Sequence, residues 1–209
     1  MTSAANIDPF FPTFLLRADF PEWESVNPLL LESAYEMKKV DQAGHEWSER
    51  EYGVGYTSYV SGMNILDYPG VKQLGDFIVS QAGEFAQFLD IDFEQISIGM
   101  TELWVNINPT YSYHTDHLHG DSLFSGVYYV QTAPGCGGIQ FRDPRPVTAM
   151  VRPPNRKKTE RNSDTVRIEP RPGLLMMFPA WLMHGVEQNL SDTDRVSISY
   201  NFGFRYNDP

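Results

Sequence analysis

A succession of short strand-forming segments after residue 93 is the feature that most constrains the fold of this chain. The segments are rich in β-branched and aromatic residues and are separated by Gly- and Pro-containing turns. We predict strands over residues 96–107, 124–130, 138–141, 165–170, 173–178 and 195–202. So many short strands, spaced by turns, are typical of a β-sandwich or a small barrel.

The first half of the chain has a different, helical pattern. Apolar residues recur at helical spacing over residues 28–40 and, more regularly, over 70–90. Residues 10–20 favour a short strand and turn, and residues 41–69, which lack a firm period, are predicted as loop. Two helices followed by a run of strands predict an all-β core with flanking helices (α+β), the N-terminal helices packed on one face.

The length of 209 residues suggests a single domain. We expect residues 1–94 to form an N-terminal strand and helical support, and residues 95–209 to form the β core. The single cysteine, Cys136, leaves no disulfide framework and no cysteine-based zinc cluster, which favours a reducing, cytoplasmic setting.

The charge balance argues against large anionic partners. Sixteen basic residues against 27 acidic residues give a net charge of −11, so neither nucleic acid nor an anionic membrane is expected to bind the surface. No apolar run is long enough to span a bilayer. Residues 152–161 are locally basic, and this loop either attracts an anionic substrate, covers a site, or is simply solvated.

Residues 113–121 hold three of the five histidines. On an extended chain, residues two apart share a face, so His114 with Asp116, or His117 with His119, could bind one metal ion. The two pairs have opposite parity, so only one of them can face inward in a regular strand. His184 follows a separate apolar strand and could supply a third ligand from across a barrel.

Arg195 lies eleven residues beyond His184 and begins another predicted strand, with Ser197 on the same face. Burying a guanidinium inside a barrel is very costly unless an anion accompanies it. We therefore expect Arg195 to face an anionic partner next to the metal.

These residues together resemble the iron(II)- and 2-oxoglutarate-dependent oxygenases, whose core is a double-stranded β-helix of the jelly-roll or cupin-like kind. Residues 96–203 are also similar to a narrower group of such oxygenases from bacteria and phages. The similarity rests on Trp-Val-Asn at 104–106, the histidine segment 113–119, Ser-Gly-Val-Tyr-Tyr-Val at 125–130, residues 138–144, and Phe-Pro-Ala-Trp-Leu-Met-His at 178–184.

The resemblance implies an enzyme that uses Fe(II) and the cosubstrate 2-oxoglutarate to hydroxylate an unidentified substrate. It assigns Arg195 to the distal carboxylate of 2-oxoglutarate, which the planar guanidinium can bind through two hydrogen bonds. Ser197 and Tyr129 would add hydroxyl groups to that carboxylate, and Asn106 would contact the inner carboxylate. Tyr129 has an equally good interpretation as an aromatic residue of the barrel core.

The resemblance also bears on the choice of metal ligands. In the narrower group a His-x-His pair precedes Ser-Gly-Val-Tyr-Tyr at a fixed distance, which matches His117 and His119. The broader superfamily more often has a carboxylate second, which would favour His114 and Asp116. We favour His117 and His119, with His184 as the third ligand in either case.

A three-histidine site departs from the usual set of two histidines and one carboxylate, and zinc is then an alternative to iron. The main alternative function is accordingly a cupin-like three-histidine metal protein, either an enzyme or a binding module, that does not use 2-oxoglutarate. Arg195 distinguishes the two hypotheses. A third alternative, a β-sandwich interaction protein without activity, leaves the spacing of His184 and Arg195 unexplained.

Overall fold

The core of the protein is built from two antiparallel sheets, seen in a computed structural model that describes residues 5–145, 150–151 and 153–207. One sheet has six strands in the order β1-β8-β5-β10-β3-β2, and the other has four in the order β4-β9-β6-β7. The strands are β1 (Leu16–Asp19), β2 (Tyr56–Thr57), β3 (Ile96–Asn108), β4 (His114–His117), β5 (Phe124–Gln131), β6 (Ile139–Arg142), β7 (Thr165–Ile168), β8 (Leu174–Pro179), β9 (His184–Val186) and β10 (Arg195–Tyr206).

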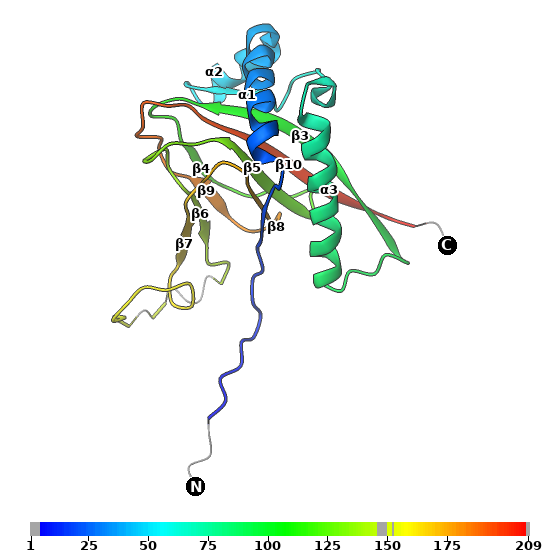
Figure 1. Cartoon of the computed structure of the whole chain (residues 1–209). Coiled ribbons are helices and arrows are strands. Elements are labelled where there is room, and N and C mark those ends of the chain that lie inside the picture. The colour runs from blue at the N-terminus through cyan, green and yellow to red at the C-terminus, as the bar shows by residue number, and fades with distance from the viewer. Residues whose placement is uncertain (1–4, 146–149, 152, 208–209) are drawn as a thin grey trace.

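Helices cover one face of the six-stranded sheet, as predicted. The long helices α1 (Trp23–Val40) and α3 (Val71–Phe88) lie in front of this sheet in Figure 1, while α2 (Gln42–Glu51) and the 3-10 helix η1 (Ile65–Asp67) connect them. The main hydrophobic core lies between these helices and the sheet. Its buried members include Leu30 and Met37 of α1, Leu74 and Ile78 of α3, Tyr128, Ile198 and Tyr200.

The opposite face of the six-stranded sheet packs against the four-stranded sheet. A second, smaller apolar cluster lies there, and it combines Val127, Met176 and Phe178 from the first sheet with Ile139 and Phe141 from the second. Two sheets with helices on one side confirm the predicted all-β core with flanking helices. None of the helices in the described part of the chain has the length and apolarity needed to cross a membrane.

Gly126 allows a large side chain to cross the strand β5. A Cβ atom on this glycine would lie 2.3 Å from Cζ of Tyr200, whose ring passes over the strand. The Tyr200 hydroxyl donates a hydrogen bond to the carbonyl oxygen of Met176 at 2.8 Å. Since Tyr200 belongs to β10 and Met176 to β8, one side chain connects three adjacent strands.

Two predictions for the N-terminal half were wrong. Helix α1 begins at Trp23 rather than at Pro28, and the turn before Pro28 packs on the sheet through Val26 and Asn27. The Asn27 amide donates to Val130 O at 2.8 Å and accepts from the Tyr128 hydroxyl at 2.6 Å. Residues 41–69, predicted as loop, contain α2, β2 and η1. Helix α2 is polar and has no apolar stripe; the Asp41 side chain caps it by accepting a hydrogen bond from Gly44 N at 3.0 Å.

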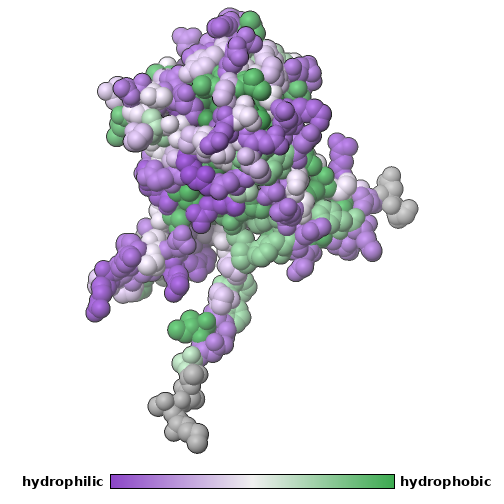
Figure 2. Space-filling model, viewed as in Figure 1, coloured by the Kyte–Doolittle hydropathy of each residue, from purple (hydrophilic) through white to green (hydrophobic). Residues whose placement is uncertain are grey.

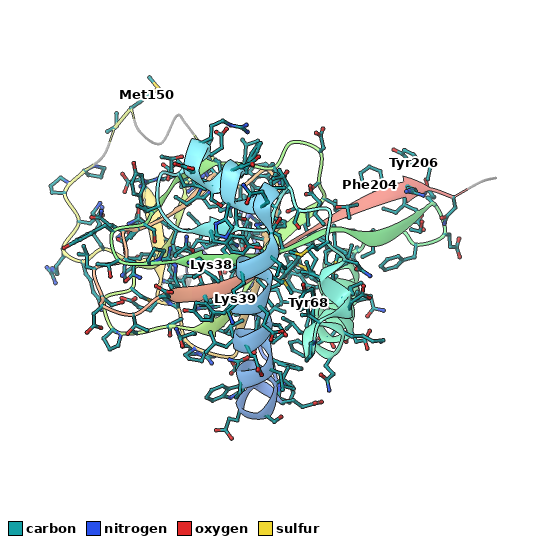
Figure 3. All side chains as sticks on the ribbon, turned by 90° about the horizontal axis from the view of Figure 1, so that it is seen from above. Lys38, Lys39, Tyr68, Met150, Phe204 and Tyr206 are labelled. Carbon is teal, nitrogen blue, oxygen red and sulfur yellow. The ribbon has the colours of Figure 1, made fainter. Side chains whose placement is uncertain are left out.

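The two ends of the described chain extend from the body. The strand predicted over residues 10–20 is confined to β1. The preceding residues form an arm that extends from the body in Figures 1 and 2, and Phe10 and Phe11 of this arm are exposed. The paired strands β3 and β10 project on another side, where Phe204 and Tyr206 lie at the far end of the ribbon (Figure 3).

Candidate functional site

A cavity of about 290 Å³ lies between the two sheets, on the face of the six-stranded sheet away from the helices. The strands β3, β10 and β5 lie side by side there in a defined register. Ser197 pairs with Asn106 on one side and with Tyr129 on the other, so these three predicted site residues form one row across the sheet. All three line the cavity, as does Arg195.

Three histidines come together in this cavity. His117 and His184 are directly paired across β4 and β9, and His119 follows two residues after His117. One ring nitrogen of each residue lies within 4.8 Å of the others, so the three imidazoles can approach a single ion. Three imidazole nitrogens that converge in this way suit Zn²⁺ or Fe²⁺.

All three histidines are neutral, and the tautomers of His117 and His184 are appropriate for binding a metal. Burial lowers the pKa of His184 to about 3 and that of His119 to about 4, and it also lowers the pKa of His117. The rings are therefore neutral near pH 7. Nδ1 of His184 lies 2.9 Å from Leu182 O, and Nδ1 of His117 lies 2.9 Å from Thr115 O. Because a carbonyl can only accept, Nδ1 carries the proton in both rings and Nε2 keeps its lone pair for a ligand.

Asn201 contacts the third ring and also binds Glu102, and neither residue was predicted from the sequence. The Nδ2 atom of Asn201, a residue that is 1% exposed, lies 3.3 Å from Nδ1 of His119 and also donates to the Glu102 carboxylate. These contacts orient the imidazole of His119. A strand parity argument could have found Asn201, which shares the face of Arg195 and Ser197.

His114 and Asp116, the alternative pair of ligands, do not point the same way. The register of β4 is irregular between His114 and His117, and the ring centroids of these two histidines lie 4.2 Å apart in the cavity. Nε2 of His114 lies 3.1 Å from the Tyr52 hydroxyl. The Asp116 carboxylate instead forms an ion pair with Arg142 at 2.8 Å on a partly exposed surface. Histidines of both parities therefore line one cavity, because β4 is not a regular strand.

Arg195 is 2% exposed, and its hydrogen bonds to the described residues all go to main-chain oxygens. Its Nη1 donates to the carbonyl groups of Cys136, Gly137 (3.3 Å) and Glu187 (3.4 Å). Burial lowers the pKa of the guanidinium below its ordinary value. No carboxylate among the described residues lies within 4 Å of it. The expected anionic partner is thus absent from this part of the protein, and the positive charge remains available to a ligand.

Hydroxyl groups next to Arg195 are available in the same way. Tyr129 and Ser197 are 2% and 5% exposed, and neither hydroxyl has a hydrogen-bond partner among the residues that the structure describes. Burial raises the pKa of Tyr129, so its hydroxyl stays protonated and can donate. Asn106 donates to the Ser199 hydroxyl at 3.0 Å. The cavity thus combines one cation with two uncharged donors.

The cavity is also lined by aromatic residues that were not predicted as site residues. Tyr52 and Tyr59 come from the segment predicted as loop, and the Tyr59 ring meets the Trp104 ring edge to face at 5.1 Å. Residues 153–161 of the basic loop are exposed and none of them lines the cavity; residue 152 lies outside the described residues.

Sequence comparison identifies a family for the segment that carries the site. The family model described as "Putative 2OG-Fe(II) oxygenase" matches residues 102–201, from the strand β3 to the strand β10. A search of curated proteins found no match.

Solved structures of similar fold cover nearly the whole chain. The α-ketoglutarate-dependent non-heme epimerase SnoN from nogalamycin biosynthesis has 13% identity and a TM-score of 0.63, over 94% of this chain and 79% of its own. A prolyl-4-hydroxylase from Pseudomonas putida has 14% identity and a TM-score of 0.59, over 94% of both chains. HygX from Streptomyces hygroscopicus, solved with nickel and 2-oxoglutarate, has 14% identity and a TM-score of 0.58, over 91% and 83%. At such low identity the likeness shows the fold, a double-stranded β-helix.

Proposed function

We propose that the protein hydroxylates its substrate with Fe(II) held by His117, His119 and His184 and with 2-oxoglutarate held by Arg195, because residues 102–201 match the family model of putative 2OG-Fe(II) oxygenases. The iron and the 2-oxoglutarate follow from the family. The assignment of these particular residues is our proposal.

The buried guanidinium of Arg195 is the observation that carries the proposal. A cation that is 2% exposed and lacks a carboxylate partner among the described residues is costly for folding. Main-chain carbonyl groups offset part of this cost through their dipoles, but they leave the net charge in place. A dicarboxylate that enters the cavity would neutralise this charge, and the hydroxyl groups of Tyr129 and Ser197 lie next to Arg195 to donate to the same ligand.

The three histidines fit a divalent metal by their chemistry. They are neutral near pH 7, and His117 and His184 keep Nε2 free because their Nδ1–H groups donate to main-chain oxygens. Bound Fe(II) would supply the redox chemistry that couples O₂ and 2-oxoglutarate to oxidation of a C–H bond. The apolar residues Val127, Phe178 and Ile139 also line the cavity and would keep water away from the reacting groups.

Calorimetry on the Fe(II)-loaded protein without oxygen, followed by a succinate assay with oxygen, tests the proposal. We expect the wild-type protein to bind 2-oxoglutarate. Arg195→Ala should keep the metal and weaken this binding by about 2–5 kcal/mol, the cost of removing one partner of a buried charge pair. Lys at this position should restore only part of the affinity, because it lacks the planar fork.

Arg171→Ala is a matched control, because this arginine is exposed and pairs with Asp19 away from the cavity. It should bind 2-oxoglutarate like the wild type. If the iron-loaded wild-type protein does not bind 2-oxoglutarate, or if Arg195→Ala binds it equally well, the cupin-like metal protein that does not use this cosubstrate becomes the better interpretation.

A further inference from the structure

We infer that the turn at residues 135–138, between β5 and β6, is a positioning element that aims the Arg195 guanidinium into the cavity, and that Gly137 is the residue on which this depends. The inference rests on the proposed function, since it concerns how Arg195 presents itself to 2-oxoglutarate. The residues of this turn do not line the cavity, so their effect on a bound ligand would act through Arg195.

The contacts of Arg195 are concentrated on one end of its guanidinium group. All three of its hydrogen bonds leave from Nη1, and two of the acceptors are the carbonyl groups of Cys136 and Gly137 in the turn. The third acceptor is Glu187 O, just after β9. Neither Nε nor Nη2 bonds to a described residue. Because the guanidinium is held through Nη1, its N–H groups on Nε and Nη2 remain available to bind a carboxylate.

The turn itself is fixed to the chain around β9 by main-chain hydrogen bonds. Glu187 N donates to Gly138 O, and Leu190 N donates to Gly135 O, both at 2.9 Å. The Glu187 carboxylate also accepts from Gly138 N at 3.1 Å. The carbonyl groups that hold Arg195 therefore belong to a braced turn.

Gly137 is required because two stretches of backbone approach each other there. Its φ is +84°, and a Cβ atom would lie 2.4 Å from Glu187 O and 2.9 Å from Gln188 O. An alanine would therefore push the turn away from the segment after β9 and move two of the three acceptors of Arg195. Gly135 has nearly the same φ, +82°, but a Cβ atom there would meet nothing within 4 Å.

The two glycines thus form a matched pair. Alanine at either position costs similar backbone strain, but only a Cβ atom at Gly137 would collide with Glu187 O, an acceptor of Arg195. We would compare Gly137→Ala with Gly135→Ala by calorimetry with 2-oxoglutarate on Fe(II)-loaded protein. Gly137→Ala should bind at least about tenfold more weakly than Gly135→Ala, because small misplacements of a binding group are costly. Metal stoichiometry should not change, and kcat at saturating 2-oxoglutarate should agree within about twofold while KM rises.

A second pair of variants covers the case in which Gly137→Ala does not fold. Glu187 and Glu169 both bind Arg167, but Glu187 also accepts from Gly138 N of the turn and from Gln140 of β6. Glu187→Ala should raise the KM for 2-oxoglutarate relative to Glu169→Ala, again without loss of metal.

The measurements distinguish a failure of the proposed function from a failure of the inference about the turn. A wild-type protein that fails to bind 2-oxoglutarate overturns the proposed function itself, whatever the glycine variants do. If the wild type binds and the two glycine variants have equal affinity, the inference about the turn is wrong. If Gly137→Ala does not fold, equal KM values for 2-oxoglutarate in Glu187→Ala and Glu169→Ala would likewise show that the inference is wrong.

Discussion

The two faces of the six-stranded sheet are made by the same strands and have opposite characters. The face under α1 and α3 carries Tyr128, Ile198 and Tyr200, which are fully buried in the main core. The opposite face carries their sequence neighbours Tyr129 and Ser197, beside a cation without a described acidic partner. Because side chains alternate along a strand, each segment contributes to stability with one set of residues and to chemistry with the other. Neighbouring substitutions should therefore have separable consequences.

The largest expected effect is the loss of the metal from the cavity face. His184→Ala removes the proposed ligand on the strand paired with that of His117, and it should abolish stoichiometric Fe(II) or Zn(II) binding while the fold is kept. Mass spectrometry measures the metal content, and circular dichroism tests whether the fold is kept. His45→Ala, in α2, is the control and should keep the metal. A full equivalent of metal in His184→Ala would contradict the three-histidine site.

The next largest effect should appear on the helix-covered face. Tyr200→Ala removes a fully buried ring and its hydrogen bond to Met176 O, and it should lower the free energy of unfolding by about 3–5 kcal/mol. Ser199→Ala, one residue away on the cavity face, should cost no more than about 1 kcal/mol. Urea unfolding of both variants measures the difference. Equal losses would show that the two faces do not divide these roles.

The cavity face should also make the metal-free protein sensitive to acid. Burial lowers the pKa of His184 to about 3. Below pH 6.5 this imidazole is therefore protonated in the unfolded chain but remains neutral in the folded protein. The free energy of unfolding should therefore fall as the pH drops from 6.5 to 5, by roughly 1–2 kcal/mol for this residue. Carboxylates, with ordinary pKa values near 4, contribute little in that window. His184→Gln should have a flatter profile, and an unchanged slope would be inconsistent with a buried neutral imidazole.

The smallest effect is expected from Asp116, which the broader superfamily pattern would make a metal ligand. Its carboxylate pairs with Arg142 on a partly exposed surface, so Asp116→Asn should keep the metal and lose no more than about 1 kcal/mol of stability. Metal content and thermal unfolding test this. Loss of the metal in Asp116→Asn would restore the pair of His114 and Asp116 as the ligands.

Segments with a clear hydrophobic period could be predicted from the sequence. Helix α3 was expected over residues 70–90 and is found at Val71–Phe88, because its apolar residues recur every three to four positions. The strand from residue 195 was likewise expected. Helix α2 could not be found in this way, since its sequence is polar and its stability depends on contacts such as the Asp41 cap.

The candidate site was predictable in its residue types but not in its details. The histidines of residues 113–121, His184 and Arg195 could be selected from the sequence, and all of them line the cavity. It could not indicate the irregularity within β4, which depends on pairing with β9 rather than on local propensity. Nor could it show that carbonyl groups of Cys136 and Gly137, far away in sequence, hold Arg195.

The position of β10 in its sheet has a consequence for the synthesis of the protein. This strand lies between β5 and β3, although both neighbours precede it by a long stretch of chain. A nascent chain that has not reached Arg195 therefore has two strands with unpaired inner edges, which are prone to mispairing. The central strand β10 begins at Arg195, so this strand and the arginine of the cavity are synthesised at the same time. We expect the sheet and the cosubstrate pocket to be completed in a single late folding event, so that a chain arrested earlier has neither.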